Sequence, residues 1–210
     1  DKFDGKFPVV FGVPRSGSTL IRNVLNTIFD GNVKVQKHTF FEPKFPTVVT
    51  YRDFRDSSVS WWRKDTGKFD NVDQIRIVSM DDHSFTRIRG RYRNEFIKYL
   101  NQFKAHHSQD NILFLRFEDF VFNFDGLFLQ IESFFDITID DDIKSEVVES
   151  LNIDHVKKTY NSSFDPSTQF NKRHVFLGKV DTWKMIVREK DHDSLTNFFR
   201  DSLQQWGYTT

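Results

Sequence analysis

The sequence contains no cysteine among its 210 residues. This absence excludes disulfide bonds, thiolate catalysis and zinc sites that use cysteine ligands. Long hydrophobic runs are also absent, so no segment is apolar enough to cross a membrane, and no signal peptide is visible. Together these absences favour a cytoplasmic protein.

The chain also lacks an excess of charge of either sign. Its 30 lysine and arginine residues balance 30 aspartate and glutamate residues. This balance argues against nucleic-acid partners and against broad adsorption to membranes, although it is compatible with a local basic pocket. A hydrophobic content of 38% and a mean hydropathy of −0.55 suit a soluble globular protein. Phenylalanine occurs 25 times, and we interpret these side chains as core filler.

Apolar segments of two periodicities alternate along the chain. Continuous apolar runs predict buried strands at 7–13 and 111–117, an alternating run predicts a short strand at 32–37, and a β-branched run predicts another at 47–51. Helical spacing predicts helices at 20–28, from Asp56, and at 85–103, 127–135, 143–151 and 195–203. The acidic run Asp140–Asp142 is expected to cap the helix at 143–151, and residues 155–175 are expected to be irregular. This alternation indicates an α/β fold with three layers, in which helices flank a central parallel sheet. At this length we expect a single domain over residues 1–210.

The segment from Val9 to Leu20, Val-Val-Phe-Gly-Val-Pro-Arg-Ser-Gly-Ser-Thr-Leu, predicts a strand, a tight turn and a helix N-terminus. Free backbone N–H groups and the helix dipole attract an anion at such a place. Gly17 permits a close backbone approach, Arg15 adds a fixed positive charge, and hydroxyl donors come from Ser16, Ser18 and Thr19. We therefore predict a phosphate or sulfate site, with an ordinary strand-to-helix turn as the alternative. The turn lacks the Gly-x-x-x-x-Gly-Lys-Ser/Thr pattern of a Walker A loop.

A second polar segment follows the strand predicted at 47–51. Arg52 comes at the strand end, and Ser60 lies in the next helix. An arginine at this position can bind a phosphate through two hydrogen bonds, and a serine in the helix can face the same group. The alternative is that Arg52 forms an ion pair with Asp53 or Asp56 on the surface, and such a pair contributes little to stability. Because ligands of parallel sheets bind at the carboxyl ends of strands, the turn at 14–19, Lys37-His38, Arg52 and the loop after Phe117 should meet at one edge.

These two segments resemble the sulfotransferase superfamily that uses 3′-phosphoadenosine 5′-phosphosulfate (PAPS). Pro14-Arg15-Ser16-Gly17-Ser18-Thr19-Leu20 is similar to the family's 5′-phosphosulfate loop, and Arg52 with Ser60 is similar to its 3′-phosphate pair. Three further segments support the resemblance, namely Phe114–Asp119, Gly178–Lys184 and the terminal Trp206-Gly207-Tyr208. Phe117 stands where the family usually has tyrosine, and Asp181 where it has glycine.

The resemblance implies a P-loop-NTPase-like sulfotransferase fold and a set of cofactor-binding residues. Arg15, Ser16, Gly17, Ser18 and Thr19 would hold the 5′-phosphate, and Arg52 and Ser60 the 3′-phosphate. Gly178, Lys179 and Trp183 would belong to a segment that closes over the cofactor. The donor would be PAPS, the product 3′,5′-bisphosphoadenosine (PAP), and no metal would be required.

The resemblance also implies an in-line displacement at sulfur. Arg15 would stabilise the leaving phosphate, assisted by Lys37 or Lys184. The family often has Lys-Thr-His with histidine as general base, whereas this chain has Lys37-His38-Thr39. Histidine suits a base at neutral pH, so His38 is the first candidate, with Glu42 and His174 as alternatives. A loop histidine without a role is the remaining interpretation.

The partner is expected to be an acceptor that bears a hydroxyl group, or an amine, on a carbohydrate, a small molecule or a peptide. Two other functions stay open at this point. One is a phosphoryl-transfer enzyme with a degenerate nucleotide loop, and the other is a non-catalytic module that binds a nucleotide or an anionic glycan. A metal site is not expected at His106-His107, because neighbouring helical residues do not share a face.

Overall fold

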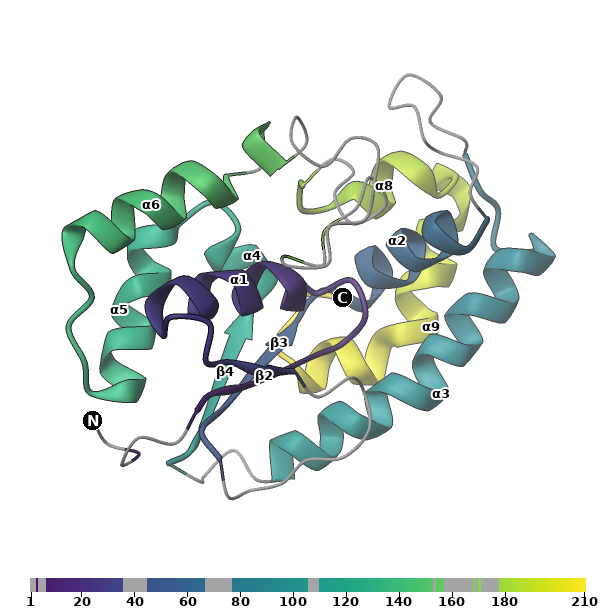
Figure 1. Cartoon of the computed structure of the whole chain (residues 1–210). Coiled ribbons are helices and arrows are strands. Elements are labelled where there is room, and N and C mark those ends of the chain that lie inside the picture. The colour runs from purple at the N-terminus through teal and green to yellow at the C-terminus, as the bar shows by residue number, and fades with distance from the viewer. Residues whose placement is uncertain are drawn as a thin grey trace. The chain divides into compact units, whose positions relative to one another are not determined.

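The computed structural model describes residues 3, 7–35, 45–66, 77–105, 110–152, 154–156, 168, 170 and 178–210. The chain divides into two compact units. Unit 1 comprises Asp1–Tyr51 and Phe103–Val175, and unit 2 comprises Arg52–Gln102 and Phe176–Thr210. Each unit has its own helices, which Figure 1 labels. The expectation of a single domain over residues 1–210 stays a prediction.

Unit 1 is built on a four-stranded parallel sheet with the strand order β2-β1-β3-β4 (Figure 1). The strands are β1 (Val9–Gly12), β2 (Lys34–Val35), β3 (Thr47–Tyr51) and β4 (Ile112–Arg116). β1 is buried throughout, and β3 is buried except at its last residue. Their β-branched and apolar composition is typical of strands that are covered on both faces.

The strand order defines the edge at which a ligand site is expected. From β1 the chain passes to β2 on one side of β1, and it then reaches β3 on the other side. Parallel sheets bind ligands at the carboxyl ends of strands where the order reverses in this way. Gly12 pairs with Thr50 at this end of β1 and β3. The turn at 13–17 follows β1 directly, and Arg52 follows β3 directly.

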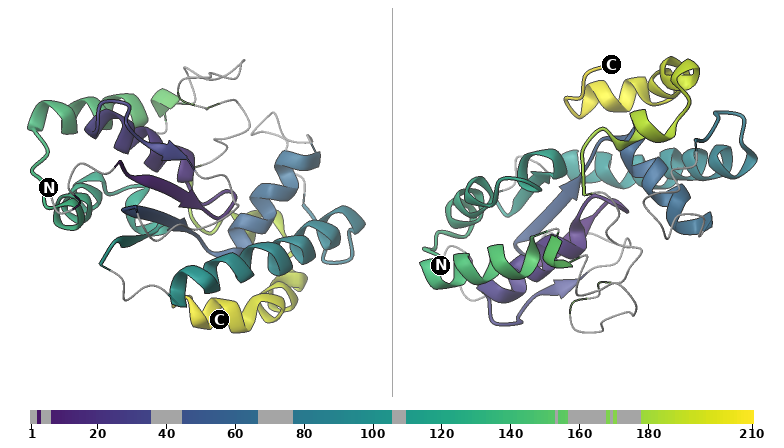
Figure 2. Two further views of the ribbon diagram at one scale, coloured as in Figure 1. Left: turned by 60° about the horizontal axis from the view of Figure 1, so that its bottom comes forward. Right: turned by 90° about the horizontal axis from the view of Figure 1, so that it is seen from above.

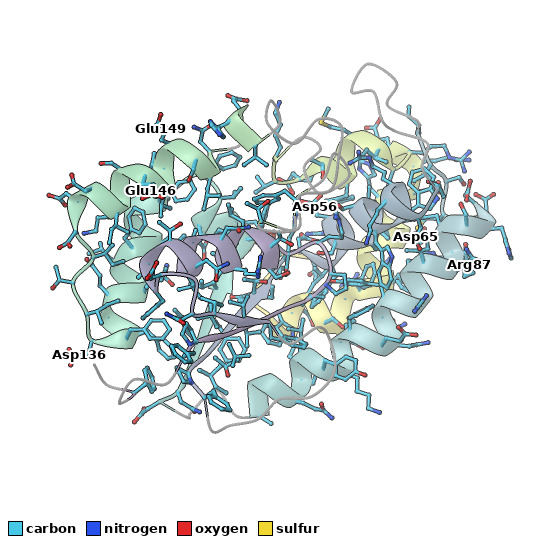
Figure 3. The ribbon with its side chains drawn as sticks, in the orientation of Figure 1. Asp56, Asp65, Arg87, Asp136, Glu146 and Glu149 are labelled. Carbon is cyan, nitrogen blue, oxygen red and sulfur yellow. The ribbon has the colours of Figure 1, made fainter. Side chains whose placement is uncertain are left out.

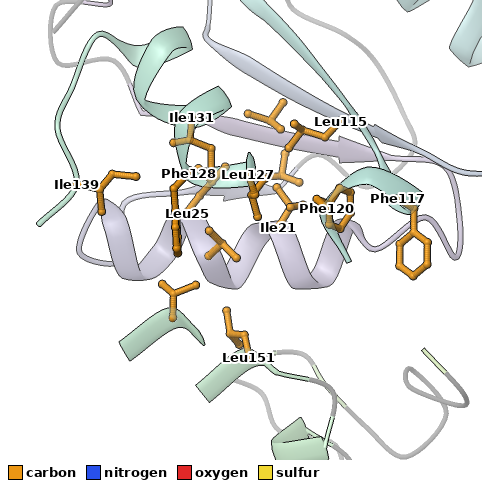
Figure 4. Packing of buried hydrophobic residues seen from close by; sticks show 14 of the residues in the cluster. Ile21, Leu25, Leu115, Phe117, Phe120, Leu127, Phe128, Ile131, Ile139 and Leu151 are labelled. Atoms are coloured by element: carbon orange, nitrogen blue, oxygen red, sulfur yellow. The ribbon is translucent and has the colours of Figure 1, made fainter. Parts of the chain in front are cut away.

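Helices cover the sheet of unit 1 with their apolar faces. They are α1 (Ser18–Ile28), α4 (Phe117–Phe120), α5 (Phe124–Phe135) and α6 (Asp141–Leu151). Ile21, Val24 and Leu25 of α1 are fully buried, and each contributes roughly 1.5–3 kcal/mol of hydrophobic stabilisation. These side chains join residues of β1, β3, β4, α4, α5 and α6 in one core (Figure 4). α6 packs against α1 (Figure 2), while Glu146 and Glu149 of α6 point outward to solvent (Figure 3).

Unit 2 is helical and has an aromatic core. It contains α2 (Phe54–Thr66), most of α3 (His83–Ala105), α8 (Thr182–Ile186), the 3₁₀ helix η1 (Glu189–Asp191) and α9 (His192–Gln205). The Phe54 ring contacts the rings of Tyr92, Phe199 and Tyr208, with centroid distances of 6.0–6.4 Å. A parallel β-bridge between Val78 and Val187 links the segment before α3 to the residue that follows α8. α2 packs against α9, in part through the rings of Phe54 and Phe199, and it also contacts α8.

The predicted α/β class, with helices flanking a parallel sheet, is confirmed, and several boundaries differ. The helix expected to begin at Asp56 begins at Phe54, and the strand expected to end at Phe117 ends at Arg116. Asp140 is the N-cap residue of α6, but its side chain makes no capping hydrogen bond, so the predicted cap is wrong in this respect. Asp141 and Asp142 do lie in the first turn, where negative charge is favourable.

Residues 154–156 form a helical turn, although irregular structure was expected from residue 155 onward. Within the described ranges, no helix combines the length and the apolar character that a membrane span requires.

Candidate functional site

The turn between β1 and α1 has a backbone suited to holding an anion. Arg15 has a φ of 72° and Gly17 a φ of 84°, so both residues adopt the left-handed conformation. Left-handed residues within a turn orient successive backbone N–H groups toward a common point, which forms an anion-binding nest. Gly17 is also the N-cap residue of α1, and the first-turn N–H groups of a helix have no intrahelical acceptor. The turn can therefore bind a negatively charged group through its backbone.

Two glycines allow this turn to pack closely against its neighbours in unit 1. A Cβ atom at Gly12 would lie 2.3 Å from Thr50 Oγ1 and 2.4 Å from the Cβ of Ser18. A Cβ atom at Gly17 would lie 2.9 Å from Cδ2 of Phe117 and 3.0 Å from Cζ of Phe120. Any larger residue at either position would displace the turn from β3 or from α4.

The hydroxyl of Ser16 faces inward. Ser16 is fully buried, and its Oγ donates to the carbonyl oxygen of Val13 at 2.6 Å and lies 2.7 Å from Thr50 Oγ1. This side chain holds the turn against β3, and its predicted contact with the cofactor stays a prediction. The side chains of Arg15, Ser18 and Thr19 are only partly buried, so they can reach a ligand.

The neighbouring strand end is lined by Tyr51 and by the start of α4. Tyr51 is half-buried, and burial raises the pKa of its hydroxyl above its ordinary value, although the charge of Arg116 opposes that rise. The hydroxyl of Tyr51 is therefore neutral near pH 7. Phe117 packs edge-on against Phe120 with a centroid distance of 5.6 Å. The ring of Phe117 thus supports the turn at Gly17 by packing.

In unit 2, Arg52 is a buried cation with protein partners. It is 7% exposed, and its Nη2 donates to Asp56 Oδ2 at 3.1 Å and to the carbonyl oxygen of Lys179 at 2.7 Å. The pairing of Arg52 with Asp56 that the sequence left as an alternative does occur, but inside the unit instead of on the surface. Ser60 lies in the second turn of α2 and is partly buried.

The segment at 178–184 contains two left-handed residues. Gly178 has a φ of 61° and Asp181 a φ of 58°. Asp181 occupies the place of a family glycine, and aspartate is one of the few residues that adopt this conformation readily. Asp181 is also the N-cap residue of α8. Aspartate at this position is therefore compatible with the left-handed backbone that the segment adopts.

Trp183 is buried in unit 2 and Lys179 is exposed. The guanidinium of Arg55 lies 4.5 Å from the centroid of the Trp183 ring, and the ring of His192 lies 4.9 Å away in an edge-on arrangement. Lys184 is exposed and pairs with Asp181 at 3.1 Å. The structure thus brings Arg52 together with the backbone of Lys179, and it anchors Trp183 by its ring.

Sequence reasoning missed Thr50 and misjudged Asp56. Thr50 holds Ser16, and the available signal was a second hydroxyl at the end of a neighbouring strand. Asp56 accepts hydrogen bonds from Thr182 and Trp183, which lie more than a hundred residues away in the sequence. A contact of that separation has no local signature.

Several predicted residues lie outside the described residues. These are Lys37, His38, Glu42, His174 and the pair His106-His107. In the part of the chain that the structure describes, no group of three histidine, aspartate or glutamate residues is arranged to hold a metal ion.

Comparisons with known proteins identify the fold. A family model described as the sulfotransferase domain matches residues 32–207, whereas no curated protein matches the chain significantly. Among solved structures, mouse sulfotransferase SULT7A1 complexed with PAP has a TM-score of 0.70 and 14% identity, covering 95% of this chain and 84% of its own. Retinol dehydratase in complex with androsterone and inactive cofactor PAP has a TM-score of 0.66 and 14% identity, covering 93% of this chain and 80% of its own. The predicted sulfotransferase-like fold is confirmed.

Proposed function

Because the chain belongs to the sulfotransferase domain family, we propose that it transfers the sulfuryl group of PAPS to a hydroxyl or amine of an acceptor. The observation that carries the donor assignment is the turn between β1 and α1, where two left-handed residues and a helix N-terminus provide backbone donors. Both solved relatives named above are complexes with PAP, which supports the same donor.

We assign the turn to the 5′-phosphosulfate. Backbone N–H groups of the turn and the hydroxyls of Ser18 and Thr19 hold its oxygens, while Gly17 lets the backbone approach. Ser16 contributes by keeping the turn against β3. Arg15 supplies the positive charge at the bridging oxygen.

We assign the 3′-phosphate to Arg52 and Ser60 of unit 2. Arginine recognises phosphate through a planar guanidinium, and Arg52 is held in a fixed orientation by Asp56 and Lys179. A 3′-phosphate distinguishes this donor from ATP. Gly178, Lys179 and Trp183 form the adjoining segment, which we propose covers the bound nucleotide.

The reaction is an in-line displacement. The acceptor oxygen forms a bond to sulfur as the bond between sulfur and the bridging oxygen breaks, and the acceptor proton passes to the general base, for which we propose His38. Negative charge grows on the bridging oxygen of the leaving phosphate, and Arg15 stabilises that charge, with Lys37 or Lys184 assisting. Preorganised charge of this kind is often the largest contribution to catalysis, and the scheme requires no metal ion.

A screen of acceptor classes with isotopically labelled PAPS tests this function. Carbohydrates, phenolic or alcoholic small molecules and peptides serve as acceptors, and mass spectrometry detects a product heavier by one sulfuryl group. ATP replaces PAPS in the control, because a degenerate phosphoryl-transfer enzyme would give a phosphorylated product instead. Transfer from ATP, or no transfer to any class of acceptor, would contradict the proposal.

A further inference from the structure

The carboxylate of Asp56 in unit 2 accepts hydrogen bonds on both of its oxygens from residues of two separate segments. Asp56 is fully buried and lies in the first turn of α2 (Figure 3). Its Oδ1 accepts from the Thr182 hydroxyl and from the backbone N–H of Trp183, both at 2.8 Å. Its Oδ2 accepts from Arg52 Nη2 at 3.1 Å. Burying a carboxylate is costly unless an opposite charge and hydrogen bonds compensate it, and here both are present.

These contacts fasten the N-terminus of α8 to the N-terminus of α2. Thr182 and Trp183 are the first two residues of α8, so Asp56 satisfies a helix-terminal N–H group and places negative charge at the positive end of the helix. The capping acid comes from a segment far away in the sequence. Asp181, the N-cap residue itself, makes no side-chain capping bond.

Two additional contacts connect the same pair of segments. Arg52 Nη2 donates to the carbonyl oxygen of Lys179 at 2.7 Å. Arg55, which Asp53 holds through an ion pair of 2.7 Å, lies over the Trp183 ring at 4.5 Å. The residues around Arg52 and the segment at 178–183 are thereby joined by charge, by hydrogen bonds and by ring stacking.

We infer that Asp56 is a positioning residue for recognition of the donor's 3′-phosphate. It fixes the guanidinium of Arg52 and the backbone at 178–183 in one arrangement before the nucleotide arrives. Because the guanidinium and the backbone segment are already ordered, less conformational entropy is lost when the nucleotide binds. This inference rests on the proposed function, because it assumes that Arg52 contacts a 3′-phosphate.

Three substitutions separate the charge of Asp56 from its hydrogen bonds. Asp56→Asn keeps the size of the side chain and one oxygen acceptor, but it removes the attraction to Arg52. Thr182→Val removes one hydrogen bond and leaves the charge in place, and Thr182→Ser restores the hydroxyl. Glu95→Gln is the matched control, since Glu95 forms an exposed pair with Arg91 at 3.1 Å on α3.

Calorimetric titration with PAP and with adenosine 5′-phosphate, which lacks the 3′-phosphate, tests the inference. We expect Asp56→Asn to weaken PAP binding about 10–100-fold, because it removes the carboxylate charge that faces Arg52, and Thr182→Val to weaken it about 3–10-fold, because it removes only one of the hydrogen bonds that this carboxylate accepts. Affinity for adenosine 5′-phosphate should change much less. Thr182→Ser and Glu95→Gln should bind both nucleotides as the wild type does.

The outcomes distinguish the inference from the function on which it rests. If the wild-type protein does not bind PAP, the proposed donor is wrong and the inference falls with it. If the wild type binds PAP but both variants lose affinity for the two nucleotides equally, Asp56 has a structural role only. Unchanged PAP affinity in both variants would also overturn the inference. Thr182→Val decides the question if Asp56→Asn does not fold, which its unfolding curve reveals.

Discussion

Arg15 combines a strained backbone with a charge at the proposed point of bond cleavage. A non-glycine residue in the left-handed region costs of the order of 1–3 kcal/mol, and Arg15 has a φ of 72°. Serine at position 16 compensates for this cost, since its buried hydroxyl bonds to Val13 and Thr50. The backbone of the turn is therefore held in its shape by contacts within unit 1 before any ligand binds.

Replacing Arg15 by alanine tests the role of this charge. Alanine keeps a Cβ atom at the same backbone conformation, so the variant removes the guanidinium with little change in strain. We expect turnover to fall about 10²–10³-fold, as when one preorganised stabilising group is removed, and PAP affinity to fall less than turnover. Steady-state kinetics and PAP titration measure both effects. Arg200→Ala, an exposed site on α9, is the control, and unchanged turnover in Arg15→Ala would refute the assignment.

Gly17 permits a comparison between strain and steric contact. Gly17 and Gly31 both have positive φ values, 84° and 77°, but a Cβ at Gly31 would meet nothing within 4 Å. Gly31→Ala should cost about 1 kcal/mol of stability from backbone strain alone. Gly17→Ala should cost about 2–4 kcal/mol, because contact with Phe117 and Phe120 adds an overpacking penalty. Urea denaturation measures the free energy of unfolding of both variants. Equal losses of stability would mean that the close approach of Gly17 to α4 imposes no additional steric penalty.

Part of the candidate site could be predicted from the sequence. The sequence predicted that Arg15, Gly17 and Arg52 lie at strand ends, because each follows an apolar strand segment within a few residues. The inward direction of the Ser16 hydroxyl could not be predicted, since it depends on Thr50 in a neighbouring strand. The sequence likewise showed that Asp181 departs from the family pattern, but it did not show that Asp181 adopts a left-handed backbone conformation.

At the scale of elements, α5 and α6 are connected by one carboxylate. Glu132 of α5 accepts from the backbone N–H of Ile139 at 2.9 Å and pairs with Lys144 of α6 at 2.9 Å. The hydrogen bond from Ile139, followed by the interaction with Lys144, lowers the pKa of Glu132 below its ordinary value. A carboxylate with a lowered folded-state pKa adds stability above its unfolded pKa and loses it as the pH falls through the folded one.

Glu132→Gln should therefore destabilise the protein at pH 7 and lose this effect in acid. The difference from the wild type should begin to shrink near pH 4.3, the usual pKa of glutamate, and disappear below the folded-state pKa. Urea denaturation across this pH range measures it. Glu146→Gln on the exposed face of α6 controls for charge alone, and a difference that does not vary with pH would contradict the prediction.

Helices were predictable from the sequence where the periodic apolar pattern extends over several turns. α1, α3, α5, α6 and α9 have apolar stripes that extend over several turns, and their existence follows from the sequence. α4 and α8 have four and five residues, too few to show a period. α8 begins where Asp56 accepts from Trp183, so its start depends on a tertiary contact. The sequence predicted the position of Asp140 at the start of α6, but it could not show that the side chain makes no capping hydrogen bond.

At the scale of the whole molecule, the fold class follows from the order of segments. Strands alternating with helices require parallel pairing and covered faces, and the buried character of β1 and β3 agrees with that requirement. The strand order β2-β1-β3-β4 could not be derived from the alternation alone. Solved structures with 14% identity share this fold, although most of their residues differ from those of this chain.

The most direct test of the account is the effect of PAP on thermal unfolding of the whole chain. A ligand that binds the folded state at a concentration of about 100 times its Kd adds about 2.7 kcal/mol of stability. For a chain of this size that corresponds to a rise in Tm of roughly 5–10 °C. The account predicts such a rise with PAP and a clearly smaller one with the same concentration of adenosine 5′-phosphate. No rise with PAP, or equal rises with the two nucleotides, would contradict recognition of a PAPS-type donor.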